Sequence, residues 1–433
     1  MKDLSNIKDK ISKLGLKNIP LSENVDILKE KIMVGDFEVN NRLAIQPMEG
    51  CDANPDGTPH ELTIRRYERF AEGGAGLIWA EAVAVMKEGR ANPRQLYICD
   101  ENIDSFKKMV EDTKNITMKK FGFEPMIIMQ ATHSGRYSKP NGFPEPLIAY
   151  NNPIFEKDNP ISKDRILSDD YLKRLEEQYG VAAIQAQKAG FDGIDIKCCH
   201  RYLLCELLSA YEREGEFGGS LENRSRLLIN GVKNAKTATD NKFLVTTRMN
   251  IYDGFPYPYG FGVKEGNGVE IDLTEPKKVI EILHKELNVP IIDITIGNPY
   301  FNPNVNRPAN TKLNLEIENP YIGVDRMYYC IGEIQKAFPE LIVVGSGVSY
   351  LNENAVNLAA GAIENGYCKI QGFGRMAFAY PDFAKDIVET GELNKSKCCL
   401  ACGKCTELMR AGSVTGCVIR DDIYKELYKE VIK

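Results

Sequence analysis

The sequence of 433 residues predicts a (β/α)8 barrel, an α/β fold in which eight parallel strands alternate with helices. Two observations predict it: eight short, nearly continuous apolar runs rich in valine and isoleucine, and segments of helical periodicity between them. Such strands are typical of a parallel sheet that helices cover, and eight of them close a barrel. A doubly wound open sheet is the structural alternative.

The expected strands recur along the whole chain. They lie within residues 41–48, 74–85, 124–134, 191–199, 242–250, 290–297, 341–347 and 367–375. The helices between them have recognisable ends, since Ser168 suits the N-cap of segment 168–190 and Pro59 lies near the first turn of segment 59–74. A third segment, 273–288, has apolar side chains at helical spacing.

Two segments precede the first strand. Residues 30–41 (EKIMVGDFEVNN) predict a hairpin with Gly35 and Asp36 at its turn, which we expect to plug the floor of the barrel. Residues 1–30 indicate a charged, helical lead-in.

Long loops follow the third, fifth and sixth expected strands, at residues 135–167, 251–268 and 298–323. In a (β/α)8 barrel these loops leave the carboxyl ends of the strands, which form the catalytic face. Long loops in compact domains are usually functional. Aromatic side chains in the second loop either wall a pocket or only cover the barrel mouth: Tyr252, Phe255, Tyr257, Tyr259 and Phe261.

The charge balance argues against polyanionic partners. The chain has 61 acidic and 55 basic residues and a net charge of -6, which attracts neither nucleic acid nor anionic lipid. No secretory signal is visible, and the longest apolar run (74–85) contains Glu81, so no membrane span is expected. We therefore expect a cytoplasmic protein, in which clustered cysteines more often bind metal than form disulfides.

Five of the twelve cysteines fall within residues 397–417. Four of them form a C-x2-C-x2-C-x11-C pattern, with Cys398 as an additional thiol: Cys399, Cys402, Cys405 and Cys417. Four converging thiolates suit a structural zinc ion or a [4Fe-4S] cluster. Zinc sites usually pair two C-x2-4-C knuckles, so this spacing favours the cluster. We assign it to a C-terminal segment, 391–433, that follows a barrel domain of residues 1–390.

A cluster carries single electrons and therefore indicates a redox partner that can divide a two-electron transfer. In a barrel this partner is expected to be a flavin, whose phosphate is held after the seventh and eighth strands. Two glycine-rich stretches occur there, at 345–349 (GSGVS) and 372–375 (GFGR), and Arg375 adds positive charge.

Residues 191–228 (FDGIDIKCCHRYLLCELLSAYEREGEFGGSLENRSRLL) resemble the signature of the old yellow enzyme family. The match extends to further motifs across nearly the whole chain: NRLAIQPM, MQATHSGR, TTRMN and GFGRMAFAYPDF. The C-terminal cysteines are similar to those of the iron–sulfur branch of this family, which includes 2,4-dienoyl-CoA reductase, 2-enoate reductase and trimethylamine dehydrogenase. The resemblance implies a TIM barrel that binds FMN next to a [4Fe-4S] cluster.

The resemblance also implies which residues bind the flavin. The backbone of Pro47 and Met48 is expected to meet it, Ala82 to pack near the ring, and Gln130 to bind the pyrimidine edge. Arg248 matches the basic residue that stabilises negative charge on the reduced flavin. The phosphate cradle corresponds to Gly347, Gly374 and Arg375.

For the chemistry, Tyr202 matches the proton-donating tyrosine of the family and His200 its second substrate-binding residue. Lys197 replaces the first family histidine, so it favours an anionic group on the substrate, or acts as a base if burial deprotonates it. Arg201 replaces a glycine and reinforces the expectation of an anionic substrate.

Glu49 stands where relatives use Thr or Cys to tune the flavin and where trimethylamine dehydrogenase attaches its flavin, so no cysteinyl flavin is expected. An ionised carboxylate there would lower the flavin potential, and a protonated one would serve as a proton relay.

The resemblance implies a reductase of activated C=C bonds, in which hydride leaves flavin N5 and Tyr202 supplies the proton. Electrons are expected from NAD(P)H directly, or through the cluster from an electron-carrier protein or an NAD(P)H-oxidising subunit. A homo-oligomer is also compatible with the family. Two alternatives stay open: an amine dehydrogenase that exports electrons through the cluster, and a non-redox barrel with structural zinc.

Overall fold

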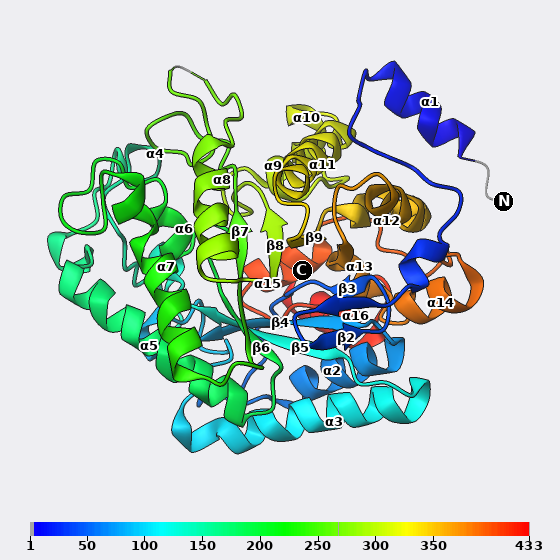
Figure 1. Ribbon diagram of the computed structural model, residues 1–433, viewed down its shortest axis with the longest axis horizontal. Helices are drawn as coiled ribbons and strands as arrows, with labels where there is room; N and C mark the ends of the chain where they lie inside the picture. Colours follow the sequence, from blue (N-terminus) through cyan, green and yellow to red (C-terminus); the bar gives the residue numbers. More distant parts are fainter. Residues whose placement is uncertain (1–3, 267, 433) are drawn as a thin grey trace.

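The computed structural model describes residues 4–266 and 268–432. Eight parallel strands form a closed barrel in the order β10-β3-β4-β5-β6-β7-β8-β9, which confirms the predicted fold class (Figure 1). Each strand lies within one of the eight predicted runs: β3 (Leu43–Ile45), β4 (Leu77–Ala84), β5 (Met126–Thr132), β6 (Gly193–Ile196), β7 (Leu244–Asn250), β8 (Ile291–Thr295), β9 (Ile342–Gly345) and β10 (Ile370–Phe373).

Helices surround the barrel (Figure 1). The eight that alternate with the strands are α2 (Glu61–Gly73), α3 (Ile103–Phe121), α5 (Asp169–Lys188), α7 (Leu221–Ala238), α8 (Thr274–Glu281), α11 (Pro320–Ala337), α12 (Ala355–Glu364) and α14 (Phe383–Thr390). The others are α1 (Ser5–Lys13), α4 (Pro153–Glu156), α6 (Leu203–Leu207), α9 (Pro303–Asn306), α10 (Lys312–Ile317), α13 (Arg375–Ala379), α15 (Lys404–Arg410) and α16 (Asp422–Val431). The Ser168 side chain caps α5, as its sequence predicts. No described helix is long and apolar enough to cross a membrane.

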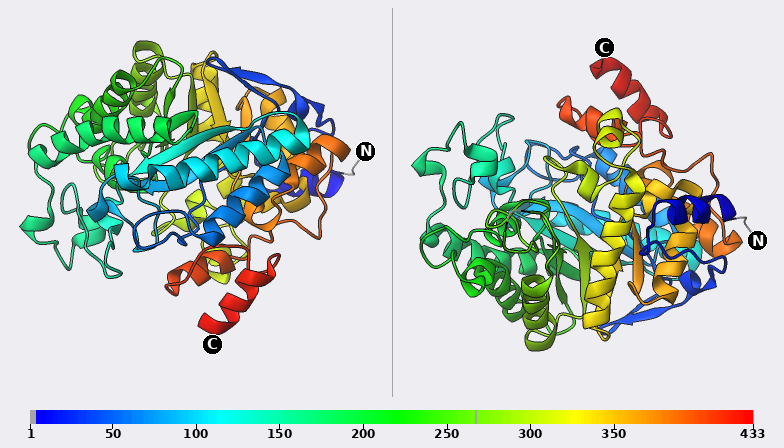
Figure 2. Two further views of the ribbon diagram at one scale, coloured as in Figure 1. Left: turned by 90° about the horizontal axis from the view of Figure 1, so that it is seen from below. Right: turned by 90° about the horizontal axis from the view of Figure 1, so that it is seen from above.

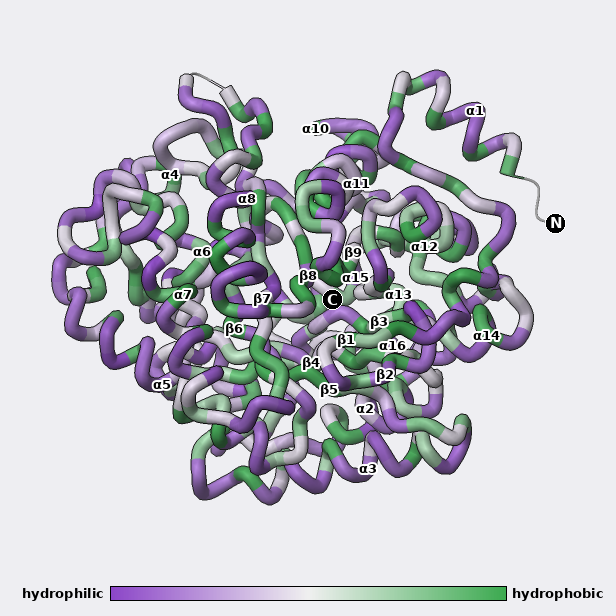
Figure 3. The backbone as a smooth tube through the Cα atoms, in the orientation of Figure 1, coloured by the Kyte–Doolittle hydropathy of each residue, from purple (hydrophilic) through white to green (hydrophobic). Residues whose placement is uncertain are grey.

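The predicted hairpin is present as β1 (Ile32–Val34) and β2 (Phe37–Val39), joined by Gly35 at a positive φ of 57°. Its apolar side chains pack with those at the amino ends of the barrel strands in one buried cluster, which includes Leu77 and Leu244. The hairpin therefore closes the floor of the barrel. The hydropathy colouring shows the corresponding concentration of apolar residues on the strands (Figure 3).

The segment after α14 runs to the end of the barrel opposite the floor hairpin, where α15 and α16 project (Figure 2). These two helices share a small apolar cluster around Leu408 and Tyr424. The segment is attached to the barrel by a hydrogen bond from Thr415 N to Gly50 O (2.6 Å) and by an ion pair between Asp421 and Arg65 (2.9 Å). The C-terminal segment thus covers part of the barrel mouth.

A buried ion-pair cluster anchors the loop that follows β3. Arg66 on α2 binds both Asp52 and Glu81, and Glu81 accepts a hydrogen bond from Gly50 N (2.8 Å). All three charged side chains are at least 95% buried. The cluster therefore fixes the backbone immediately after Glu49.

We expect Arg66→Met to lower the free energy of unfolding by about 3–5 kcal/mol, because it leaves two buried carboxylates without their cation. Denaturant unfolding would measure this loss. The control is Arg65→Met, which removes a partly exposed cation and should cost less than about 1 kcal/mol. Equal losses in the two variants would contradict the interpretation.

Candidate active site

A cavity lies at the carboxyl ends of the barrel strands, beneath the C-terminal segment, and we call it the mouth cavity. All but two of the residues predicted to be catalytic or cofactor-binding line it: Pro47, Met48, Glu49, Lys197, His200, Tyr202, Arg248, Gly347, Gly374 and Arg375. The exceptions, Ala82 and Gln130, are buried neighbours in the barrel wall, where Gln130 Nε2 donates to Asp195 Oδ2 (2.7 Å). The barrel thus gathers side chains that are far apart in the sequence.

Lys197, Glu49 and Tyr202 form one network at the end of β6. Glu49 Oε1 accepts hydrogen bonds from Lys197 Nζ (3.2 Å) and from the Tyr202 hydroxyl (3.3 Å). The Lys197 ammonium also lies 3.9 Å from the centre of the Tyr202 ring, a cation–π contact. Glu49 therefore balances the charge of Lys197. Burial, together with the negative charge of Glu49, raises the pKa of Tyr202 well above its usual range, so its phenol is protonated.

His200 is held neutral. Burial and the neighbouring cations Arg248, Lys197 and Arg307 lower the pKa of its imidazole well below the usual 6.5. Its backbone, like that of Arg201, has a positive φ of 61°, an uncommon conformation for residues with a side chain and one that clusters at functional sites.

The expectation that Arg201 attracts an anionic substrate is wrong. Its fully buried side chain turns away from the mouth cavity and pairs with Asp253 (2.9 Å), whose β-carboxylate satisfies its charge.

The end of the cavity next to β7 and β8 has an ion pair and a buried hydrogen-bond acceptor without a partner. Arg248 Nε lies 2.8 Å from Asp293 Oδ2, and burial raises the pKa of Asp293 to about 7 in spite of this cation. Gln46 Nε2 donates to Asp293 Oδ1 (3.1 Å), but its buried Oε1 has no hydrogen-bond partner. A ligand with an N–H donor, such as a flavin ring, fits this acceptor.

The other end of the cavity suits a phosphate. Arg375 and Arg307 both line it, and neither pairs with a carboxylate in residues 4–266 and 268–432. Burial and repulsion from Arg375 lower the pKa of Arg307 to about 10. Gly347, with a φ of 98°, and Gly374 provide backbone without side chains beside them. The two guanidiniums donate hydrogen bonds to neutral oxygens, such as Pro308 O (2.8 Å) for Arg375. Without a carboxylate partner among the described residues, they fit the phosphate of FMN.

The four cysteines of the C-x2-C-x2-C-x11-C pattern line a second, smaller cavity next to the first: Cys399, Cys402, Cys405 and Cys417. Cys405 lines both cavities. The chain turns between these thiols at Ala401 and Gly403, whose φ angles are 51° and 77°. Burial and the nearby Cys399 and Cys405 raise the pKa of Cys417 to about 11.

Within the described residues, no three His, Cys, Asp or Glu side chains are grouped closely enough to form a ready-made metal site. The donor set itself, four thiols around one enclosed space, fits either a [4Fe-4S] cluster or zinc. Cys398 is buried outside this cavity, with its Sγ 3.4 Å from Asn394 O.

Some cavity residues were missed by the sequence reasoning. Tyr300 and Arg307 come from the loop after β8, and Thr406 and Met409 come from α15. The unusual length of the loop after β8 indicated a functional loop, but nothing in its sequence distinguished Tyr300 and Arg307 from their neighbours. The second pair reaches the cavity only because the C-terminal segment folds over the mouth.

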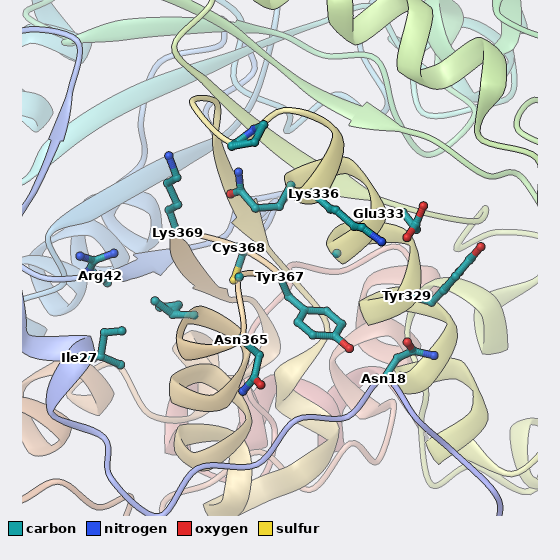
Figure 4. Close-up of a pocket in the computed structure, with 15 residues that line it drawn as sticks. Asn18, Ile27, Arg42, Tyr329, Glu333, Lys336, Asn365, Tyr367, Cys368 and Lys369 are labelled. Atoms are coloured by element: carbon teal, nitrogen blue, oxygen red, sulfur yellow. The ribbon is translucent and has the colours of Figure 1, made fainter.

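A separate cavity of about 710 Å³ lies at the amino ends of β3 and β10, away from the mouth (Figure 4). It contains none of the predicted site residues. Its charged residues include Arg42, which pairs with Glu30 (3.0 Å), and Glu333, which pairs with Lys277 (3.0 Å).

Histidine burial near the site makes the fold sensitive to acid. Burial lowers the pKa of His133 from 6.5 to about 4. Its Nδ1 accepts a hydrogen bond from Gly135 N (3.2 Å), so Nε2 carries the proton and donates to the Tyr171 hydroxyl (2.9 Å). Below pH 6.5 the unfolded chain binds a proton that the folded chain does not, so stability is lost as the pH falls from 6.5 towards 4.

His133 is therefore expected to contribute a loss of about 1.4 kcal/mol per pH unit in this range. Urea unfolding between pH 7 and 4.5 would measure the slope. His133→Gln should flatten the slope, whereas the exposed control His60→Gln should not. An unchanged slope in His133→Gln would contradict the interpretation.

The closed barrel and its mouth cavity fit the barrel oxidoreductases that hold a flavin at the carboxyl ends of the strands. The model of the NADH:flavin oxidoreductase / NADH oxidase family matches residues 28–306, and the chain belongs to this family.

Two curated relatives are a NADH oxidase of Thermoanaerobacter brockii and a NADPH dehydrogenase of Bacillus subtilis. The first is 26% identical over 415 residues, which cover 92% of this chain and 57% of the relative. The second is 31% identical over 227 residues, which cover 51% of this chain and 63% of the relative. This chain therefore spans only about three fifths of the length of these relatives.

Solved structures share the fold. A complex of 2-naphthoyl-CoA reductase matches with a TM-score of 0.75 at 18% identity, covering 94% of this chain and 58% of that one. Histamine dehydrogenase from Rhizobium sp. 4-9 matches with a TM-score of 0.70 at 20% identity, covering 93% and 53%. The old yellow enzyme homologue from Zymomonas mobilis matches with a TM-score of 0.62 at 22% identity, covering 85% and 94%.

Proposed function

We propose that the protein is an FMN- and [4Fe-4S]-dependent ene-reductase, which adds a hydride and a proton across an activated C=C bond. The observation that carries the proposal is the position of Tyr202, a buried, protonated phenol that lines the mouth cavity beside Lys197 and His200. The family supports FMN as the cofactor and NAD(P)H as an electron source.

The flavin would be held by two groups of residues. Those at the ring end are Pro47, Met48, Glu49, Ala82, Gln130 and Arg248, and those at the phosphate end are Gly347, Gly374 and Arg375. Bound FMN supplies hydride from its N5 atom. The protein supplies the binding surface, the orientation of the substrate and the proton.

Tyr202 would donate its proton to the α-carbon, for which a phenol that stays protonated at neutral pH is suited. Neutral His200 and the Lys197 ammonium would bind the activating carbonyl or carboxylate, whose developing negative charge they stabilise. Among the residues that line the cavity, Glu49 is the one carboxylate, against four cations: Lys197, Arg248, Arg307 and Arg375. Arg307 and Arg375 would hold the flavin phosphate and Arg248 pairs with Asp293, so Lys197, which lies beside Tyr202, is the cation that would favour an anionic substrate.

The cluster would be bound by Cys399, Cys402, Cys405 and Cys417 in a segment, 391–433, that is separate from the barrel domain, 1–390. It supplies one-electron transfers when present. Cys405 supports this role because it borders the mouth cavity as well as the cysteine cavity. An electron-carrier protein is then a candidate partner alongside NAD(P)H.

The first test is an anaerobic absorption spectrum of the purified protein, with assays of iron, acid-labile sulfide and released flavin. We expect FMN and about four irons per chain. The dithionite-reduced protein should then be reoxidised by an α,β-unsaturated acid or thioester, and the oxidised protein should not be reduced by an amine such as trimethylamine. Reduction by the amine would favour an amine dehydrogenase, and a colourless zinc protein would overturn the redox mechanism.

A further inference from the structure

The mouth cavity contains a second phenol in contact with Tyr202. The Tyr300 hydroxyl lies 3.0 Å from the Tyr202 hydroxyl, and the two rings are nearly parallel, 6.3 Å apart. Tyr202 is 1% exposed, whereas Tyr300 is 39% exposed. The pair therefore joins the buried Tyr202 to a tyrosine that is partly exposed.

The Tyr202 hydroxyl has two hydrogen-bond partners, Glu49 Oε1 (3.3 Å) and the Tyr300 hydroxyl (3.0 Å). A phenol has one proton, so when Tyr202 donates to Glu49 it accepts from Tyr300. Glu49 accepts from both Lys197 and Tyr202, so as a carboxylate it has no proton to return.

Tyr300 is held in this position by its surroundings. Its ring packs on that of Tyr137, with the centres 4.1 Å apart. Asn298 accepts a hydrogen bond from Tyr300 N (2.9 Å) and donates one to the Tyr137 hydroxyl (2.9 Å). The ring is thus fixed before any ligand binds.

We propose that Tyr300 is a proton-relay and positioning residue that returns a proton from solvent to Tyr202 after each turnover. The inference rests on the proposed function. The Tyr202 O–H bond breaks as its proton joins the α-carbon, and the resulting phenolate oxygen accepts the proton of Tyr300. The Tyr300 oxygen then takes a proton from water, so one solvent proton is consumed for each hydride delivered.

If Tyr300 is the relay, its replacement affects the first turnover and later turnovers differently. In Tyr300→Phe the proton already on Tyr202 is still available, so the prereduced enzyme should reduce one equivalent of alkene at close to the wild-type rate. Reprotonation of Tyr202 should then be slow. We expect steady-state kcat to fall by about tenfold with KM changed less than about twofold, on the scale of a positioned proton transfer.

The measurement is a stopped-flow single turnover with crotonyl-CoA, read by flavin absorbance and by a pH-indicator dye. In the wild type, proton uptake from solvent should follow product formation closely, and in Tyr300→Phe it should lag behind. Added imidazole buffer should shorten the lag, because the exposed edge of the cavity admits a small acid. The matched control is Tyr137→Phe, which removes a phenol that packs on Tyr300 but forms no hydrogen bond with Tyr202.

The possible results test the proposed function and the Tyr300 relay separately. If none of the alkenes tested, crotonyl-CoA included, reoxidises the reduced flavin of the wild type, the proposed function is wrong. If the wild type reduces the alkene but Tyr300→Phe shows no lag in proton uptake, or Tyr137→Phe shows the same lag, the relay is overturned. A lag confined to Tyr300→Phe supports it, and near-ultraviolet circular dichroism of the flavin-free variants would confirm that they are folded.

Discussion

Replacing Tyr202 with phenylalanine is expected to lower kcat/KM for alkene reduction by about 10²- to 10⁴-fold, because it removes the proposed proton donor from a buried site. The variant keeps the ring that packs on Lys197, so only the proton transfer from the hydroxyl should be lost. Reduction of the flavin by NAD(P)H needs no proton from Tyr202 and should stay within about threefold of the wild type. Stopped-flow measurement of the two half-reactions would separate them.

The matched control for Tyr202 is Tyr367→Phe, which changes a tyrosine in the cavity at the opposite end of the barrel (Figure 4). This variant should reduce the alkene at the wild-type rate. If Tyr202→Phe slowed both half-reactions equally, the hydroxyl would have a structural effect on the flavin site, and the assignment of Tyr202 as proton donor would be wrong.

Cys405→Ser is expected to prevent binding of the proposed iron–sulfur cluster, because a serine oxygen replaces one of four thiolates. The iron content should fall from about four per chain to near zero, while FMN is retained by the barrel. Electron transfer from a one-electron donor to the flavin should then be lost. Metal analysis and the visible spectrum of the anaerobic protein would measure these changes.

Cys398→Ser is a stringent control because Cys398 belongs to the same cysteine-rich stretch but is buried outside the four-cysteine cavity. This variant should keep its iron. Loss of iron from Cys398→Ser with retention in Cys405→Ser would show that the ligand set is different. One zinc per chain in the wild type, lost in Cys405→Ser, would instead indicate a structural metal.

Much of the fold is determined by local sequence. Each of the eight strands lies in an apolar run of the length that a buried parallel strand requires, and helical periodicity separates the runs. The floor hairpin could be predicted because Gly35 allows the positive φ of its turn. These features depend on neighbouring residues, so a linear pattern contains them.

The membership of the mouth cavity could also be predicted in large part, because residues at the carboxyl ends of parallel strands meet at one face. This rule places Pro47, Lys197 and Arg248 together although Pro47 follows β3, Lys197 follows β6 and Arg248 lies in β7. It gives no information on residues such as Thr406, which reach the cavity from the C-terminal segment.

The sequence by itself therefore determined the barrel, the face that carries the site and the four-cysteine pattern. Only the tertiary structure decided how the charges and protons of that site are paired. Glu49 neutralises Lys197 across 148 positions, Asp253 takes Arg201 out of the cavity, and Tyr300 meets Tyr202 across 98 positions. The physical reason is that ion pairs and hydrogen bonds depend on distances of a few ångströms between loops, and the periodicity of a chain does not encode those distances.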